Sequence, residues 1–383
     1  MLEALQSGRS GIRVSQEYRS AGMRSQVAGL PSLAAEPAID RKSRRFMGEV
    51  SAYAYHAMRK AIRDADLQPE LVSHAKTGLI IGSGAGSLSS YVQAIDALRA
   101  GGMKKVPPYV VPQAMASSAS ATLATAYRIQ GVSYSVSAAC SSAAHAIGQA
   151  AQLIRSGTQE VVFAGGAEEG GWSSALPFDA MNALSTGYND RPEGASRPYD
   201  TARDGFVMAA GAGMLVLEEL SHAKGRGARC YGEICGYGAS SGGDMVGVSP
   251  TAAAAAMQSA LDQAGLERVD YVNTHAIGSE AGDIAELDAL RRVFGEAVPL
   301  VSSTKGLSGH SLGASAAQEA IYALLMMNAG FVAGCANLEH RDPAAATFPL
   351  VTGCMPASVA SVMSNSFGFG GTNASLILRT LKA

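Results

Sequence analysis

The sequence predicts an α/β layered fold built from two similar halves, and three observations indicate it. Apolar, strand-like runs alternate with longer helix-like segments along the chain. The order of elements in Tyr134–Glu169 recurs in Leu300–Asn337, which is a weak internal repeat. Of the 383 residues, 47% are hydrophobic and 16% are charged, so the chain can bury a large core.

The internal repeat defines the expected halves. Each repeated segment reads as a strand, a turn, a helix and a second strand. Lys76–Ser87 and Val269–Ser279 also correspond, since both are apolar strands that end in a glycine-containing loop. A Lys/Gly/Arg-rich stretch at His222–Ala228 separates the two repeats. We therefore predict a first half at residues 1–226 and a second half at residues 227–383.

The two halves differ at their beginnings. The second half opens with a strand at Cys230–Ser241, whereas the first half has no matching strand before Ala4. We therefore expect the first half to lack its opening strand. Either a longer natural chain or a divergent variant would explain this difference.

The composition argues against several classes of protein. A net charge of −2 gives no general attraction to nucleic acid or anionic membranes. The five cysteines are odd in number and include no C-x-x-C pair, which argues against a disulfide framework or a zinc site and fits a reducing cytosol. No signal-peptide-like segment follows Met1, and the apolar stretch Ala316–Ala333 carries polar residues, as buried helices do. We expect a cytoplasmic protein with no nucleic-acid or membrane partner.

Cys140 is the candidate nucleophile. It lies between an expected strand and an expected helix, where free N–H groups and the positive helix end favour a thiolate. The same turn leaves a backbone N–H for a developing oxyanion. An inert, buried cysteine is the alternative. The following helix is rich in small residues, which fits either a helix buried between two sheets or an ordinary alanine-rich helix.

Two histidines lie at equivalent strand ends of the second half. His275 follows an apolar strand, and His310 lies in a further strand-to-helix turn. A neutral imidazole there could donate a hydrogen bond to a carbonyl, although a lone histidine is often structural. Lys305 could tune the local field, and Glu286 could anchor its ammonium group. The alternative for both is an ordinary solvated charge.

A glycine-rich turn lies near the end of the chain, at Ser364–Ser375. Glycines allow a close approach of the backbone to a ligand. Phe367 and Phe369 in this turn could gate an apolar channel, or could simply pack. The earlier glycine run at Gly82–Gly86 misses the G-x-G-x-x-G spacing, so it predicts no dinucleotide cofactor.

Four separated motifs resemble a known family. They are VSAACSSAAH around Cys140, NTH with His275, STKGLSGHSLGA with Lys305 and His310, and SNSFGFGGTNA near the end. Together they resemble the β-ketoacyl-[acyl carrier protein] synthase I/II branch of the thiolase superfamily, and synthase I most of all. The similarity runs almost from end to end, with the motifs in the same order and spacing.

The resemblance implies a five-layer α-β-α-β-α fold, a homodimer, and no cofactor or metal. It also implies a two-step condensation in fatty-acid or related polyene or polyketide elongation. Cys140 would take an acyl group from acyl carrier protein as a thioester. His275 and His310 would then support decarboxylation of malonyl-carrier protein, and the carbanion would attack the acyl-cysteine.

Further roles follow from the resemblance alone. The backbone N–H groups of Cys140 and Phe369 would form the oxyanion hole, and Phe367 would share the role of gate with Phe369. Lys305, with Glu286, would keep the charge balance of the site.

Carrier protein is acidic, so its docking surface should be basic. Arg41, Lys42 and Arg45 match a stretch implicated in docking in this family, and Arg128 is a plausible neighbour. Such charges mainly set the encounter rate and orientation. An ordinary charged helix end is the alternative.

Two features depart from the family. The family carries a G-T-S-T run whose threonines hydrogen-bond the phosphopantetheine arm, and this chain has Ala276-Ile277-Gly278-Ser279 there. Ile277 has no hydroxyl to donate, and Ser279 can substitute only in part. The missing opening strand is the second departure, and its loss should be severely destabilising because the family places it inside the first sheet.

Two other functions are weighed against an elongating synthase. One is a non-catalytic subunit that pairs as a heterodimer with an active ketosynthase and sets chain length. Such partners generally lack the nucleophile, which Cys140 supplies here. The other is a thiolase-like degradative enzyme, which would carry a second cysteine late in the chain and use coenzyme A esters.

Overall fold

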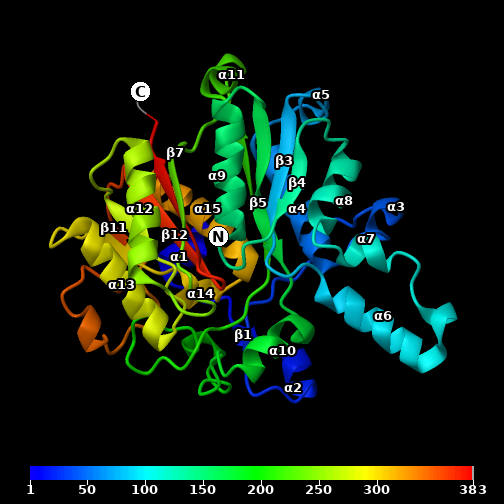
Figure 1. Ribbon diagram of the computed structural model, residues 1–383, viewed down its shortest axis with the longest axis horizontal. Coiled ribbons are helices and arrows are strands. Elements are labelled where there is room, and N and C mark those ends of the chain that lie inside the picture. Colours follow the sequence, from blue (N-terminus) through cyan, green and yellow to red (C-terminus); the bar gives the residue numbers. More distant parts are fainter. Residues whose placement is uncertain (382–383) are drawn as a thin grey trace.

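Two mixed β-sheets form the framework of the chain, of which the computed structural model describes residues 1–381 (Figure 1). The first sheet has the order β4-β3-β5-β6. Its strands are β3 (Thr77–Gly82), β4 (Ser133–Val136), β5 (Val161–Glu168) and β6 (Gly211–Glu218). β3 runs parallel to β4 and β5, and β6 runs antiparallel to β5.

The second sheet has the order β7-β13-β12-β8-β9. Its strands are β7 (Glu233–Ser241), β8 (Tyr271–Asn273), β9 (Leu300–Ser302), β12 (Ser361–Gly368) and β13 (Thr372–Arg379). β12, β8 and β9 are parallel, and β13 is antiparallel to both of its neighbours. The two sheets therefore share one strand order, except that the described first half has no counterpart of β7.

Helices separate the sheets and cover their outer faces. The longer ones are α4 (Glu49–Asp64), α6 (Leu88–Gly101), α8 (Ser118–Tyr127), α9 (Ser142–Arg155), α12 (Pro250–Ala264), α13 (Glu280–Phe294) and α15 (Ser315–Ala329). The shorter ones are α1 (Leu2–Ser7), α2 (Gln16–Ser20), α3 (Arg41–Arg44), α5 (Pro69–Val72), α7 (Val110–Ala114), α10 (Trp172–Ala180), α11 (Leu220–Gly225) and α14 (Lys305–Ser308).

The middle layer consists of α9 and α15. Alanines of both helices share one core with Ile80 and Val162 of the first sheet and Val362 and Leu376 of the second. The outer layers are α4 with α8 on the first sheet and α12 with α13 on the second. The predicted five-layer α-β-α-β-α arrangement is therefore confirmed.

Small side chains are required in the middle layer because the helix and the second sheet nearly touch. A Cβ atom on Gly148 of α9 would lie 2.4 Å from the ring of Tyr237 on β7. Ala143, Ala146 and Ala150 on the same helix are fully buried. Of the two interpretations of this small-residue helix, the one that buries it between two sheets is correct.

The remaining secondary structure is short. Two small antiparallel ladders join β1 (Arg13–Val14) to β2 (Val27–Ala28), and β10 (Phe331–Val332) to β11 (Met355–Pro356). In the described part of the chain, no helix is both long and apolar enough to cross a membrane. All five cysteines are free.

Candidate active site

Three reactive side chains converge between the two halves. The sulfur of Cys140 and ring nitrogens of His275 and His310 all lie within 4.8 Å of one another. The two imidazoles meet edge to face, with ring centroids 5.2 Å apart. Cys140 comes from the first half and both histidines come from the second, so the site exists only because the halves pack together.

The Cys140 turn is built by its neighbours. β4 ends at Val136 and α9 begins at Ser142, as the sequence pattern predicts. Ser142 Oγ accepts a hydrogen bond from the backbone N–H of Ala138 at 2.8 Å, and this bond closes the turn. Ala139 has φ of 47°, a left-handed conformation that a residue with a Cβ adopts at a cost of about 1 kcal/mol or more. This tight turn directs the Cys140 sulfur toward the second half.

The surroundings of Cys140 oppose the thiolate that its position at a helix N-terminus favours. Burial raises the pKa of the Cys140 thiol to about 12, and the Lys305 ammonium only partly opposes that effect. Glu168 raises the pKa further through its negative charge. Desolvation therefore outweighs the helix N-terminus, and the neutral thiol of Cys140 is favoured over the thiolate.

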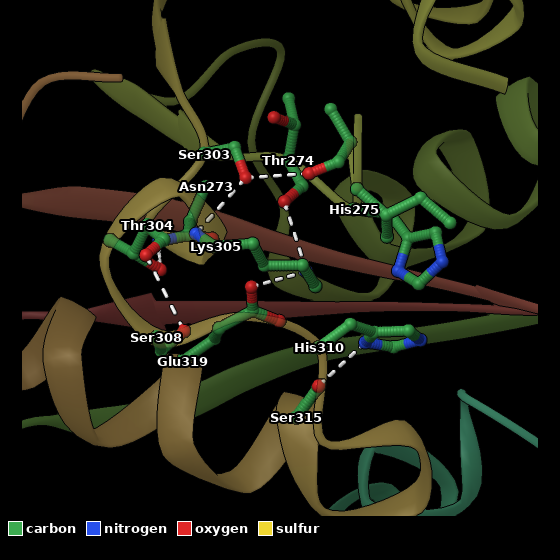
Figure 2. Close-up of polar contacts among 12 residues, drawn as sticks. Asn273, Thr274, His275, Ser303, Thr304, Lys305, Ser308, His310, Ser315 and Glu319 are labelled. Atoms are coloured by element: carbon green, nitrogen blue, oxygen red, sulfur yellow. Dashed lines mark hydrogen bonds and ion pairs between the residues drawn. The ribbon is translucent and has the colours of Figure 1, made fainter. Parts of the chain in front are cut away.

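His310 is held by backbone on both sides. Its N–H donates to the carbonyl of Val207 at 2.8 Å, and its carbonyl accepts from Ala209 N at 2.9 Å. Its Nδ1 lies 2.8 Å from Ser315 Oγ at the start of α15 (Figure 2). Its Nε2 is buried and has no hydrogen-bond partner within the described chain. That nitrogen is therefore free to act on a substrate or on the thiol.

His275 is placed by the carboxylate of Glu286. Glu286 accepts hydrogen bonds from the backbone N–H groups of His275 (3.0 Å) and Ala276 (2.9 Å), and from Asn365 Nδ2 (3.0 Å). The carboxylate thus fixes the chain at the end of β8 and connects it to β12. Glu286 therefore holds His275 through its backbone.

Both imidazoles are neutral. Burial first, and then the positive charge of Lys305, hold the pKa of His275 well below its usual range, and the same two causes act on His310. A neutral imidazole can donate one N–H to a carbonyl oxygen and accept a proton at its other nitrogen. The expectation from the sequence that both histidines are uncharged agrees with their lowered pKa values.

Lys305 pairs with Glu319, and the expected pairing with Glu286 is wrong. In the described chain the Lys305 ammonium forms its ion pair with the Glu319 carboxylate on α15, and it also lies 3.5 Å from the carbonyl of Thr274 (Figure 2). Both side chains of this pair are almost fully buried. Glu286 is engaged by N–H donors instead, and burial raises its pKa to about 7.

Glu319 was missed by the sequence analysis, although it left a signal. It is a lone carboxylate in the apolar helix SAAQEAIYALL, and such a charge is rarely buried without a partner. The pair carries a positive charge close to both histidines while its net charge remains zero. That arrangement keeps the imidazoles neutral without leaving an isolated buried charge.

Glu168 was also missed. At the end of β5, its buried carboxylate accepts from Ser83 Oγ (3.0 Å) and from the N–H groups of Gly84 (2.6 Å), Ala85 (3.2 Å) and Gly313 (3.0 Å). Gly313 belongs to the 3₁₀ turn that follows His310, so one carboxylate ties the first half to the histidine segment of the second. Burial raises its pKa to about 7.

The glycine-rich turn lies directly on the nucleophile loop. A Cβ atom on Gly368 would stand 2.9 Å from the carbonyl of Ala138, and Thr372 Oγ1 donates to that same carbonyl at 3.1 Å. Phe367 is buried and packs edge-on against His275, with centroids 5.8 Å apart. Phe369 is 38% exposed and faces Phe178 at 6.2 Å. Of the two aromatics, Phe369 is the one with room to move.

The expected carrier-arm residues lie beside the site. Ile277 packs in one apolar cluster with Cys140, Phe178 and Phe206. Ser279 caps helix α13, where its Oγ accepts from Gly282 N at 3.1 Å. The Ser279 hydroxyl oxygen is thus already engaged, which limits its use for a substrate.

The expected docking cations lie on different elements. Arg41 and Lys42 are exposed on α3, and Arg45 follows that helix with its guanidinium 4.6 Å from the ring of Phe46. Arg128 is exposed directly after the C-terminal end of α8, where its carbonyl accepts a hydrogen bond from Ser73 Oγ. That Arg128 belongs to the same docking surface stays a prediction.

Comparison with known proteins agrees with this geometry. Residues 1–223 match the model "Beta-ketoacyl synthase, N-terminal domain" and residues 231–339 match "Beta-ketoacyl synthase, C-terminal domain". A 3-oxoacyl-[acyl-carrier-protein] synthase 1 of Escherichia coli is 52% identical, over 100% of this chain and 95% of the relative.

Two solved structures have the same fold. A β-ketoacyl synthase from Burkholderia phymatum is 36% identical with a TM-score of 0.93, over 99% of this chain and 94% of that one. A second structure is described as a type II PKS acyl-carrier protein in complex with its ketosynthase. It is 25% identical with a TM-score of 0.90, over 100% of this chain and 94% of that one. The chain therefore belongs to the β-ketoacyl synthase family of the thiolase superfamily, and its curated relatives of that name are acyltransferases.

Proposed function

We propose that this chain condenses an acyl group held on Cys140 with malonyl-carrier protein, and releases a 3-oxoacyl-carrier protein and CO₂. The observation that carries the proposal is the convergence of one thiol and two neutral imidazoles within 4.8 Å. The names of the relatives support acyl carrier protein as the partner that brings both substrates.

The first step is acyl transfer to sulfur. His310 Nε2 and His275 Nδ1 are both buried without a hydrogen-bond partner in the described chain, and either imidazole can accept the thiol proton of Cys140 at such a nitrogen. The thiolate attacks the acyl-carrier thioester, and the carrier thiolate leaves with that proton. The backbone N–H groups of Cys140 and Phe369 would hold the developing oxyanion.

The second step is decarboxylation and condensation. In this step His310 carries its proton on Nε2, with Ser315 Oγ donating to Nδ1, so that His275 and His310 both donate hydrogen bonds to the malonyl thioester carbonyl. These bonds stabilise the enolate formed as CO₂ leaves. The enolate carbon attacks the acyl-Cys140 carbonyl. Collapse of the tetrahedral intermediate expels the Cys140 sulfur, which regains a proton. Lys305, paired with Glu319, disfavours the charged form of both imidazoles, so a proton taken from the thiol is passed on readily.

The remaining assignments also belong to this proposal. The outer edge of β4 is unpaired in the described chain and its residues are half-exposed or exposed, which supports pairing with a second copy as a homodimer. Arg41, Lys42 and Arg45 would receive the acidic carrier protein. Five free cysteines support a reducing cytoplasm. We place the boundary between the halves at residues 226 and 227, between α11 and β7.

The test is a condensation assay with purified protein, acyl-carrier proteins of graded chain length and malonyl-carrier protein. We expect 3-oxoacyl-carrier protein by mass spectrometry from the wild type and none from Cys140→Ala. A non-catalytic partner subunit would give no product from either. Because a thiol and two imidazoles can also bind Zn²⁺, a chelator is included, and loss of product with it would contradict the metal-free mechanism.

A further inference from the structure

The thiol and the two imidazoles of the site resemble the ligand set of a metal ion. The Cys140 sulfur and a ring nitrogen of each histidine lie within 4.8 Å of one another. His310 Nε2 and His275 Nδ1 are buried and have no hydrogen-bond partner in the described chain. Within residues 1–381 no other group of three or more histidine, cysteine or carboxylate side chains comes together in this way.

The types of ligand atom select the class of metal. Thiolate sulfur and imidazole nitrogen suit Zn²⁺, whereas Mg²⁺ and Ca²⁺ require oxygen ligands. In a tetrahedral zinc site two nitrogens are about 3.3 Å apart, and each is about 3.6 Å from the sulfur. The three atoms here need to approach by at most about 1.5 Å to reach that geometry. Cys140 is partly exposed, so an ion can reach its sulfur.

Neighbouring groups already hold the three ligands. Ser315 Oγ lies 2.8 Å from His310 Nδ1, and a hydrogen bond of this kind leaves the other ring nitrogen for a metal (Figure 2). The Glu286 carboxylate fixes the backbone of His275. The turn at Ala139, with φ of 47°, directs the Cys140 sulfur toward both rings. The ligand set is therefore organised before an ion arrives.

The charges around the site tolerate a cation. A Zn²⁺ ion bound to the Cys140 thiolate has one net positive charge. The Lys305 ammonium is offset by Glu319, and Glu168 and Glu286 add two further carboxylates nearby. As the Zn–S bond forms, the thiol proton passes to solvent, whereas the neutral imidazoles bind without releasing a proton. The metal itself deprotonates a thiol that burial otherwise keeps neutral.

We propose that Cys140, His275 and His310 form an inhibitory Zn²⁺ site, in which the ion occupies the atoms that condensation requires. The inference rests on the proposed function, because the ion inhibits only if these side chains carry out the reaction. Bound Zn²⁺ withholds the sulfur from acylation and the ring nitrogens from the enolate. A thioester sulfur provides no thiolate ligand, so an acyl group on Cys140 excludes the ion. Zinc therefore holds the free, unacylated chain inactive.

Binding is measured directly, so that the test does not depend on condensation. The reduced full-length chain, freed of metal and of reductant, is titrated with ZnCl₂ in the absence of oxygen by calorimetry. We expect one ion per chain and no binding of Mg²⁺ at the same concentration. X-ray absorption of the bound zinc should show one sulfur at about 2.3 Å and two nitrogens at about 2.0–2.1 Å.

Single substitutions identify the ligands. Cys140→Ser should weaken Zn²⁺ binding at least 100-fold, and His275→Gln and His310→Gln at least tenfold each. Ser315→Ala should weaken it about 10- to 100-fold through the orientation of His310. Cys354→Ser is the matched control, because it removes an exposed free cysteine outside the site. It should leave both Zn²⁺ binding and condensation unchanged.

Inhibition is measured separately. Zn²⁺ should lower the rate of condensation at least tenfold, and excess chelator should restore it. Prior acylation of Cys140 by acyl-carrier protein should weaken Zn²⁺ binding at least tenfold, since the thiolate ligand is then lost.

The outcomes separate this inference from the proposed function. Zn²⁺ binding that persists in Cys140→Ser, binding that neither histidine variant weakens, or condensation that Zn²⁺ leaves unchanged would overturn the inference alone. A chain that binds one Zn²⁺ through these three ligands, but forms no 3-oxoacyl product with chelator present, would refute the proposed function and still support the metal site.

Discussion

In the proposed reaction the first half of the molecule supplies the reactive atom, and the second half supplies the groups that control it. Around Cys140 the neighbours are apolar, including Phe206, Ile277 and Leu312. Around His275 and His310 lie a buried ion pair and a carboxylate that binds backbone N–H groups. The difference indicates that neither half is an active site alone, and that the packing between the halves sets the chemistry.

The largest effect is expected when the contribution of the first half, the Cys140 sulfur, is removed. Cys140→Ser should lower condensation by at least about 10³-fold, because a hydroxyl in the same place is a far weaker nucleophile. Its Tm should stay within a few degrees of the wild type. Condensation assays and thermal unfolding check both, and a variant that kept its rate would refute the nucleophile.

The next largest effect is expected for the buried ion pair of the second half, Lys305 with Glu319. Glu319→Ala should destabilise the fold by about 3–5 kcal/mol, because it leaves the Lys305 charge buried and unpaired. Denaturant unfolding measures this loss. Replacing both residues, as Lys305→Met with Glu319→Leu, should cost clearly less, and an equal loss would show that packing rather than charge is responsible.

A third change separates the two steps. His310→Ala should lower decarboxylation by about 10²–10³-fold, because it removes a donor to the enolate oxygen. Acylation of Cys140 should fall less, since His275 stays within reach. Rates of CO₂ release and of acyl-enzyme formation are measured separately. Equal losses in both would contradict the division of roles.

A fourth change tests the carboxylate that joins the halves. The folded-state pKa of Glu168 is raised to about 7, so its contribution to stability is present at low pH and is lost as pH rises from about 4.5 to 7. Glu168→Gln removes this loss, so the stability difference between wild type and variant should change by up to about 3 kcal/mol between pH 4.5 and 8. Urea unfolding at both pH values measures it, and a pH-independent difference would contradict the assignment.

The smallest effect concerns substrate binding. Ile277→Thr restores a hydroxyl beside the site and should lower the KM for acyl-carrier protein about 2- to 10-fold. Ile277→Val has the same shape as threonine without the hydroxyl and is the matched control. Equal KM values for the two variants would mean that the carrier arm is held elsewhere.

The sequence predicted what depends on local pattern. The turn at Cys140 and the loops at His275 and His310 follow from strand-to-helix transitions that short stretches of sequence reveal. The shared strand order of the halves followed from the repeat. Each of these features is encoded by residues that are close together along the chain.

What depends on distant contacts was predicted less well. The partner of Lys305 is decided by the position of α15 against the second sheet, which brings Glu319 rather than Glu286 to the ammonium group. The protonation state of Cys140 is decided by burial against the second half, which outweighs the helix end beside it. In the sequence Glu168 looks like the ordinary last residue of a strand. Only the fold brings it the N–H donors from both halves.

Intact mass spectrometry of the protein after incubation with acyl-carrier protein tests the central claim most directly. The account predicts one acyl mass increment on the wild type, none on Cys140→Ala, and retention of the increment on His275→Gln. An unmodified wild type, or an increment that survives in Cys140→Ala, would contradict a nucleophile that the first half supplies and the second half controls.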